Sequence, residues 1–190
     1  MQLLKKKIIS DGAVIGTDII KIDSFLNHQL DVGLISEIGK EFAHRFEDVQ
    51  IDKILTIEAS GIAIACAAAM YMGNLPVVFA KKAAPSTMTD GYYTTEVTSF
   101  TKRTVSKVMV SKKYISRDEK ILIIDDFMAH GEAALGLARL TEQAGAIVAG
   151  VGVAVEKAFQ GGSLKLKQEG YRVESLAVIN AIKEGQIIFR

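Results

Sequence analysis

Residues 121–134 read ILIIDDFMAHGEAA, a run that passes from an apolar strand into two acids, a small-residue turn and a helix. Ligands of open α/β sheets bind at the carboxyl ends of strands. A turn that feeds a helix offers free N–H groups and a positive dipole end to a phosphate. Asp125 and Asp126 can accept hydrogen bonds from a vicinal diol, so the run predicts a sugar-phosphate site. An Asp pair that binds Mg²⁺ or caps a helix is the alternative.

The segments around this run show a regular alternation. Apolar runs at 54–57, 77–80, 121–124 and 147–155 predict strands, and runs of this kind are typical of parallel strands buried on both faces. Between them, residues 32–46, 61–72 and 132–143 have the periodicity of helices. The alternation indicates an α/β fold with a doubly wound, mostly parallel sheet.

A polar excursion at residues 83–107 interrupts the alternation, with Pro85 and many Ser, Thr and Tyr residues. Its pattern at 95–100 and 105–110 predicts two antiparallel strands joined near 101–103. Such an excursion is usually a functional lid or a disordered loop. We expect a single domain over 1–190, with a core at about 31–155, a flexible lid at about 83–107, and a small hood from about 1–30 and 156–190.

Composition excludes several classes of protein. The 190 residues carry a net charge of +1, which gives no reason to expect nucleic-acid or membrane affinity. The apolar runs are too short for a membrane span, so we expect a soluble, cytoplasmic protein. The single cysteine, Cys66, rules out a disulfide framework, and its alanine-rich surroundings predict a buried core position.

Two other segments could bind an anion. The turn from Glu58 to Gly61 leads from a strand into a helix, although Ser-Gly before a helix is ordinarily a cap. Lys81 and Lys82 follow another strand and are either a solvated edge or part of a site. No P-loop, nucleophile elbow or metal-ligand spacing of histidines occurs, and Gly150-x-Gly152 lacks the rest of a dinucleotide fingerprint.

Residues 121–134 resemble the motif that binds phosphoribosyl pyrophosphate (PRPP) in type I phosphoribosyltransferases: an apolar strand, two acids, two apolar residues and a small-Thr-Gly-like loop. Residues 22–29, 56–62, 156–160 and 170–177 are similar to bacterial xanthine phosphoribosyltransferases, and the likeness covers nearly the whole chain. It implies transfer of the phosphoribosyl group from PRPP to xanthine, giving XMP and pyrophosphate in purine salvage. It also implies Mg²⁺ with PRPP, no organic cofactor, and a homodimer.

The resemblance assigns roles by position. Asp125 and Asp126 would be the catalytic pair that holds the ribose hydroxyls. The 5-phosphate would be cradled by Ala129, His130, Gly131, Glu132 and Ala133. The pyrophosphate would be faced by Glu58, Ala59, Ser60, Gly61 and Lys82. Xanthine would be contacted by Ile20, Asn27 and Lys157, with Phe127 stacked on it.

Two departures from the family pattern bear on chemistry. Ala129 stands where related 6-oxopurine enzymes have an Asp that helps remove the purine proton. Xanthine loses its proton comparatively readily, so it has the least need of such an Asp. Glu132 places a carboxylate in a phosphate loop, so we expect its side chain to point outward while its N–H serves the phosphate. The alternatives are a guanine or hypoxanthine phosphoribosyltransferase, or a PRPP-sensing regulator without catalysis.

Overall fold

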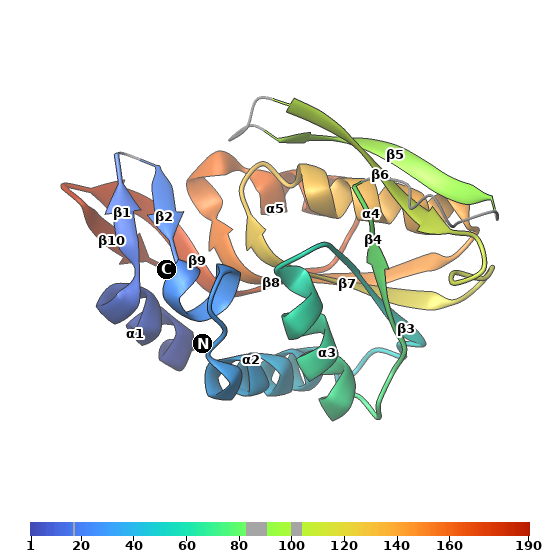
Figure 1. Cartoon of the computed structure of the whole chain (residues 1–190), viewed down its shortest axis with the longest axis horizontal. Helices are drawn as coiled ribbons and strands as arrows, with labels where there is room; N and C mark the ends of the chain where they lie inside the picture. The colour runs from blue at the N-terminus through green and yellow to red at the C-terminus, as the bar shows by residue number, and fades with distance from the viewer. Residues whose placement is uncertain (17, 83–90, 100–103) are drawn as a thin grey trace.

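A six-stranded sheet in the order β10-β9-β8-β7-β3-β4 forms the centre of the molecule (Figure 1). The computed structural model describes residues 1–16, 18–82, 91–99 and 104–190. All neighbouring strands pair in parallel except β10, which is antiparallel to β9. The strands are β3 (Lys53–Ile57), β4 (Val77–Ala80), β7 (Lys120–Met128), β8 (Ile147–Lys157), β9 (Val173–Lys183) and β10 (Gln186–Phe189). The predicted α/β fold with a mostly parallel sheet is confirmed.

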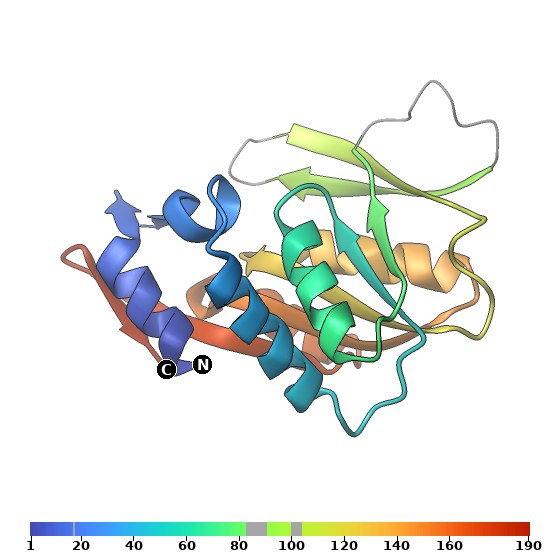
Figure 2. The ribbon, with the colours of Figure 1, turned by 60° about the horizontal axis from the view of Figure 1, so that its bottom comes forward.

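Helices cover both faces of the sheet (Figure 2). The helices α2 (Val32–Arg45) and α3 (Gly61–Tyr71) lie on one face, and α4 (Glu132–Gln143) and α5 (Gly162–Gln168) lie on the other. Because side chains alternate along a strand, Leu122 and Ile124 of β7 pack with the α2 and α3 cluster. Their neighbours Ile121 and Ile123 pack with the α4 cluster. The sheet is therefore doubly wound, as predicted.

The two glycines of β8 have a packing role and are not part of a dinucleotide-binding turn. A side chain at Gly150 would come within 2.5 Å of the Phe46 ring, and one at Gly152 within 2.8 Å of the Phe42 ring. These glycines let α2 and the residue after it approach the sheet closely.

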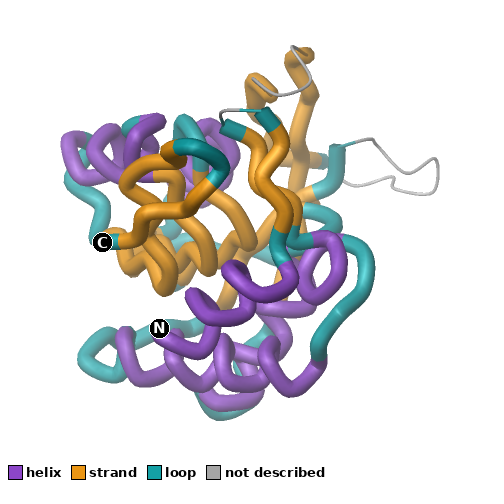
Figure 3. Tube along the Cα trace, turned by 90° about the vertical axis from the view of Figure 1, so that its left-hand side faces the viewer, coloured by secondary structure: helices purple, strands orange, loops and turns teal. Residues whose placement is uncertain are grey.

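The two chain ends lie at the same end of the molecule (Figures 2 and 3). The N-terminal segment forms α1 (Gln2–Asp11), β1 (Ala13–Ile15), β2 (Ile19–Lys21) and the short helix η1 (Asp23–Asn27). The Met1 ammonium donates to the Leu176 carbonyl, and the Lys5 ammonium donates to the Arg190 carbonyl. The C-terminal segment adds β9 and β10 to the central sheet, and β8 runs on to Lys157, so the boundary between core and hood remains a prediction.

The polar excursion forms an antiparallel ribbon of β5 (Tyr92–Ser99) and β6 (Thr104–Ser111), paired from Tyr92↔Ser111 to Ser99↔Thr104. These strands confirm the predicted pair. Residues 83–90 and the predicted joint at 101–103 lie outside the described residues, so the lid stays a prediction. The ribbon rests on α4 (Figure 1), where a side chain at Gly136 would meet Val97 at 2.5 Å.

Two predictions about single elements were wrong. The strand predicted at 121–124 continues to Met128, because β8 is long enough to pair with it as far as Met128↔Glu156. Cys66 is exposed, because it lies on the side of α3 that faces away from the sheet. Among the described residues, no helix is long and apolar enough to cross a membrane.

Candidate active site

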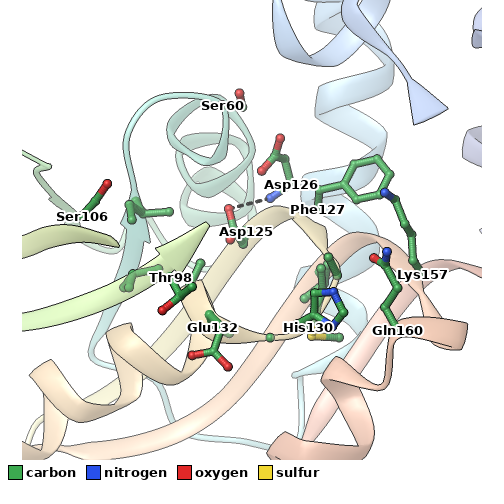
Figure 4. Close-up of a pocket in the computed structure, with 18 of the residues that line it drawn as sticks. Ser60, Thr98, Ser106, Asp125, Asp126, Phe127, His130, Glu132, Lys157 and Gln160 are labelled. Atoms are coloured by element: carbon green, nitrogen blue, oxygen red, sulfur yellow. Dashed lines mark hydrogen bonds between the residues drawn. The ribbon is translucent and has the colours of Figure 1, made fainter. Parts of the chain in front are cut away.

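The site lies where the strand order reverses. The chain enters the sheet at β3, adds β4 on one side, and returns to β7 on the other side of β3. The carboxyl ends of β3 and β7 are therefore neighbours, and ligands of doubly wound sheets bind at such a point. A cavity of about 690 Å³ opens there. All the predicted site residues except Gly61 line it, and Figure 4 shows several of them.

The two acids of β7 have different surroundings. Asp125 is buried, with 5% of its surface exposed, and its Oδ1 accepts the Asp126 N–H at 3.0 Å (Figure 4). Burial, and then the charge of Asp126, raise the pKa of Asp125 well above its ordinary value. Asp126 is only half-buried and lines the cavity. Asp126 is thus the acid better placed to accept hydrogen bonds from a ligand's hydroxyls.

Gly61 lies behind the cavity wall. A side chain there would meet Thr56 Oγ1 at 2.2 Å and Asp125 Oδ1 at 3.3 Å. The glycine therefore lets the start of α3 approach the buried acid. Gly61 thus lies against Asp125, and its contact with pyrophosphate stays a prediction.

The turn after β3 is tied to the end of β4. The Lys82 N–H donates to Glu58 Oε1 at 2.7 Å, and Glu58, Ala59 and Ser60 line the cavity at the start of α3. The Glu58–Ala59 peptide is cis. Lys82 is exposed and lines the same cavity. One wall thus combines a helix N-terminus with a cation, a combination that suits an anionic group.

The loop between β7 and α4 forms a second wall of the cavity, and its position before a helix suits an anionic group. Gly131 has φ 80° and precedes the twelve-residue helix α4. The Gly162 N–H donates to the Ala129 carbonyl at 3.1 Å. A side chain at Gly162 would come within 2.5 Å of that carbonyl and 2.8 Å of the Gly131 nitrogen. The loop therefore rests directly on Gly162 and holds its shape at the N-terminus of α4.

The carboxylate of Glu132 is paired away from the two acids of β7. The Lys165 ammonium lies 2.6 Å from Glu132 Oε1, and 19% of the Glu132 side chain is exposed. In Figure 4 its carboxylate points away from Asp125 and Asp126. The ion pair offsets the repulsion that a carboxylate would exert on a bound phosphate. The geometry agrees with the expected outward side chain.

The opposite end of the cavity joins a ring to a cation. The Lys157 ammonium lies 5.3 Å from the centre of the Phe127 ring and donates to the Asp18 carbonyl at 2.8 Å. Burial lowers the pKa of Lys157, and the charge of Asp18 opposes that shift. Ile20 and Asn27 line the same end. An apolar plane beside a hydrogen-bond donor suits a flat heterocycle that carries carbonyl oxygens.

Several residues of the cavity were missed by sequence reasoning. The ribbon contributes Thr98, Thr104 and Ser106, and Gln160 follows β8 (Figure 4). Thr104 and Ser106 are two residues apart on β6, so they share a side of the strand. That spacing was the available signal, but it does not say that the ribbon folds over α4.

Three comparisons place the chain among known proteins. The model of the phosphoribosyl transferase domain matches residues 29–182. A xanthine phosphoribosyltransferase of Clostridium novyi is 56% identical over 190 residues, and one of Clostridioides difficile is 53% identical, each match covering the whole of both chains. The adenine phosphoribosyltransferase of Rhodothermus marinus superposes with a TM-score of 0.73 at 18% identity, covering 94% of this chain and 100% of that one.

These matches fit the geometry of the site. The solved structure shares the arrangement of sheet and helices, and at 18% identity this likeness concerns the fold alone. The family model spans both strand ends that line the cavity, and the relatives span the full length. The chain therefore belongs to the phosphoribosyltransferase family and has its type I fold.

Proposed function

We propose that this protein is a xanthine phosphoribosyltransferase, which transfers the 5-phosphoribosyl group of PRPP to xanthine and releases pyrophosphate. The observation that carries the proposal is the composition of a single cavity. It has two walls suited to anions, the carboxylate of Asp126 between them, and at its other end the Phe127 ring beside the Lys157 ammonium. The named relatives, at 53% and 56% identity over the full chain, support xanthine as the base.

The loop at residues 129–133, the phosphate loop, would hold the sugar together with Asp126. The backbone N–H groups at the start of α4 would bind the 5-phosphate, and Asp126 would accept hydrogen bonds from the ribose hydroxyls. In the reaction the bond between C1′ and the pyrophosphate oxygen breaks, and a bond from C1′ to the base nitrogen forms. Carboxylates beside the ribose favour the positive charge that develops on the sugar in between.

The turn at Glu58–Ser60 and Lys82 would receive the leaving pyrophosphate. Among the described residues, no three His, Cys, Asp or Glu side chains gather to hold a metal ion. Mg²⁺ commonly binds through one or two carboxylates plus substrate phosphates. Asp126 beside the pyrophosphate wall fits such an ion, which would neutralise charge on the leaving group.

Lys157 and Phe127 would select the base. The ammonium donates hydrogen bonds and accepts none, so it favours a purine carbonyl and disfavours the exocyclic amine of adenine. Phe127 would lie against the ring. Ala129 provides no carboxylate for removing the base proton, which suits a base that ionises readily, as xanthine does.

The relatives' names also support a role in purine salvage. A cytoplasmic location and a homodimer complete the proposal, and sedimentation velocity measures the oligomeric state. A protein that sediments as a monomer at assay concentrations would contradict the dimer alone.

A base panel tests the proposed function. The protein is mixed with PRPP, Mg²⁺ and either xanthine, guanine, hypoxanthine or adenine, and nucleotide formation is followed. Xanthine should give the highest kcat/KM. Preferred turnover of guanine or hypoxanthine would move the assignment to that base, and no turnover with any base would leave a PRPP-binding regulator.

A further inference from the structure

Gln160 lies beside the base-binding end of the cavity without a role in the scheme above. It is the last residue of the short helix η2 (Ala158–Gln160), three positions after Lys157, and it lines the cavity. In the view of Figure 4 its side-chain amide reaches up between His130 and Lys157. The amide thus lies in the part of the cavity that holds the cation and the Phe127 ring.

The amide oxygen of Gln160 lacks a donor. Its Oε1 is buried and accepts no hydrogen bond from the described part of the chain. Buried polar atoms are nearly always paired, and an unpaired one costs stability. The nearby Lys157 ammonium donates a hydrogen bond to the Asp18 carbonyl and none to the Gln160 amide oxygen.

The backbone that carries Gln160 is held by the phosphate loop. Gly161 ends η2 with φ 79°, and the next residue, Gly162, donates to the Ala129 carbonyl at 3.1 Å. A side chain at Gly162 would also press on the loop. Gln160 is therefore anchored to the element that would hold the sugar phosphate, so its distance from a bound nucleotide's base is set by the fold.

We propose that Gln160 is a specificity-determining residue whose amide oxygen accepts a purine ring N–H next to the carbonyl that Lys157 holds. The proposal rests on the proposed function and deepens it. A carboxamide presents an acceptor and a donor side by side and turns about its last bond to offer either one. A ring N–H beside a carbonyl is the complement of that pair. The Lys157 ammonium can only donate, so it can bind the carbonyl but not the ring N–H. An acceptor for that N–H has to come from a second residue.

Such a contact discriminates strongly. A site that hydrogen-bonds a substrate N–H rejects an analogue without it, because the site's polar group is then left buried and unpaired. Xanthine carries ring N–H groups at N1 and N3, and hypoxanthine and guanine lack the one at N3. A contact between Gln160 and the N3 hydrogen would therefore favour a dioxopurine over guanine and hypoxanthine, whereas a contact with the N1 hydrogen would not distinguish these bases.

The test compares Gln160→Met, which keeps the length but has no acceptor, with the matched control Gln168→Met at the exposed end of α5. Gln160→Met should raise KM for xanthine by about 10- to 100-fold and leave KM for PRPP within about twofold. The control should change neither constant. A parallel rise in both constants would show that Gln160 only supports the loop, and unchanged constants would show that it does not touch the base.

N-methyl analogues identify the contact. In the wild-type protein, 1-methylxanthine or 3-methylxanthine should be a poorer substrate than xanthine, and that penalty should shrink in Gln160→Met for one of the two. Gln160→Glu keeps an acceptor and should keep the penalty. Equal penalties in wild type and Gln160→Met for both analogues would overturn the proposal.

Calorimetry separates this proposal from the proposed function. Gln160→Met should weaken binding of XMP by the same factor as the change in KM, and it should bind ribose 5-phosphate as the wild type does. A protein that turns over no base contradicts the proposed function. Equal binding of XMP by wild type and variant contradicts the role of Gln160, whatever the turnover.

Discussion

At the scale of single residues, two adjacent acids of β7 are chemically unlike because the strand buries one and leaves the other half-buried. Asp125 sits under the start of α3, where Gly61 lets the helix approach, and its pKa is raised. Asp126 lines the cavity and remains available to a ligand. The same residue type twice in succession therefore supplies one buried group and one group that faces the cavity.

Replacing Asp126 with Asn should lower kcat/KM for PRPP by about 10- to 100-fold, because a charged acceptor for the ribose hydroxyls is lost. The loss should be the same with every base that the protein uses, and steady-state kinetics on the base panel measures it. Asp118→Asn is the matched control, since Asp118 is exposed and its φ of 64° suits Asn. A loss confined to one base would contradict the role.

Replacing Lys157 with Met should act on the base and spare PRPP. The variant loses the donor for a purine carbonyl, so KM for xanthine should rise by about 10- to 100-fold, while KM for PRPP stays within about twofold. Lys183→Met, at an exposed position near the end of β9, is the control. If KM for PRPP rose as much as KM for xanthine, Lys157 would be a support of the hood through Asp18.

Sequence reasoning assigned roles to residues that follow one another in a motif. It gave no role to Thr98, or to Gln160, although Gln160 lies in the similar segment 156–160. Asp125, Asp126 and the loop to Ala133 follow one another in the chain, so their order alone predicted a shared site. Gln160 and Thr98 reach the cavity only through tertiary packing. The buried position predicted for Cys66 was wrong, because an alanine-rich helix without charges has no polar side that reveals which residues face solvent.

At the scale of elements, the phosphate loop and the segment after β8 support each other through glycines. Gly162, the first residue of α5, donates to the Ala129 carbonyl, and a Cβ on it would lie 2.8 Å from the Gly131 nitrogen, so a larger residue would displace the loop. The sequence shows the glycines but not that they meet. The length of β7 could not be predicted either, because it depends on how far β8 continues to pair with it.

Replacing Gly162 with Ala should shift the phosphate loop, because the added Cβ would lie 2.5 Å from the Ala129 carbonyl. We expect a rise of about tenfold or more in KM for PRPP, in line with the strong effect of small displacements at a binding site. Gly33→Ala in the first turn of α2 is the control: its Cβ would meet only Asp31 Oδ1, at 3.5 Å, so KM for PRPP should not change. An unchanged KM in Gly162→Ala would mean that the loop adapts freely.

At the scale of the whole molecule, the reversal of strand order decides where the cavity lies. Alternating apolar strands and helices predicted a doubly wound sheet, and the general rule then predicted a site at the carboxyl ends. The order β7-β3-β4 is set by crossovers that leave no local mark in the sequence. The placing of β9 and β10 in the central sheet escaped prediction for the same reason.

The buried carboxyl group of Asp125 makes the free energy of unfolding depend on pH. Because folding raises the pKa of Asp125, the protonated form of that carboxyl favours the folded state. Its contribution to stability is fully present below the pKa of the unfolded chain, near 3.9, and is lost as the pH rises through the folded value. At neutral pH the buried carboxyl therefore lowers the free energy of unfolding, a cost that is typical of functional sites.

Asp125→Asn should accordingly be more stable than the wild type, by an amount that grows with pH. The Asn side chain keeps an oxygen for the Asp126 N–H and carries no charge. Thermal unfolding without ligands should give similar Tm values near pH 4 and a higher Tm for the variant at pH 8, by about 2–4 °C for each kcal/mol relieved. Asp118→Asn should show no such trend. A variant that is less stable at pH 8, or a Tm difference independent of pH, would show that the charge of Asp125 is stabilised in the folded protein.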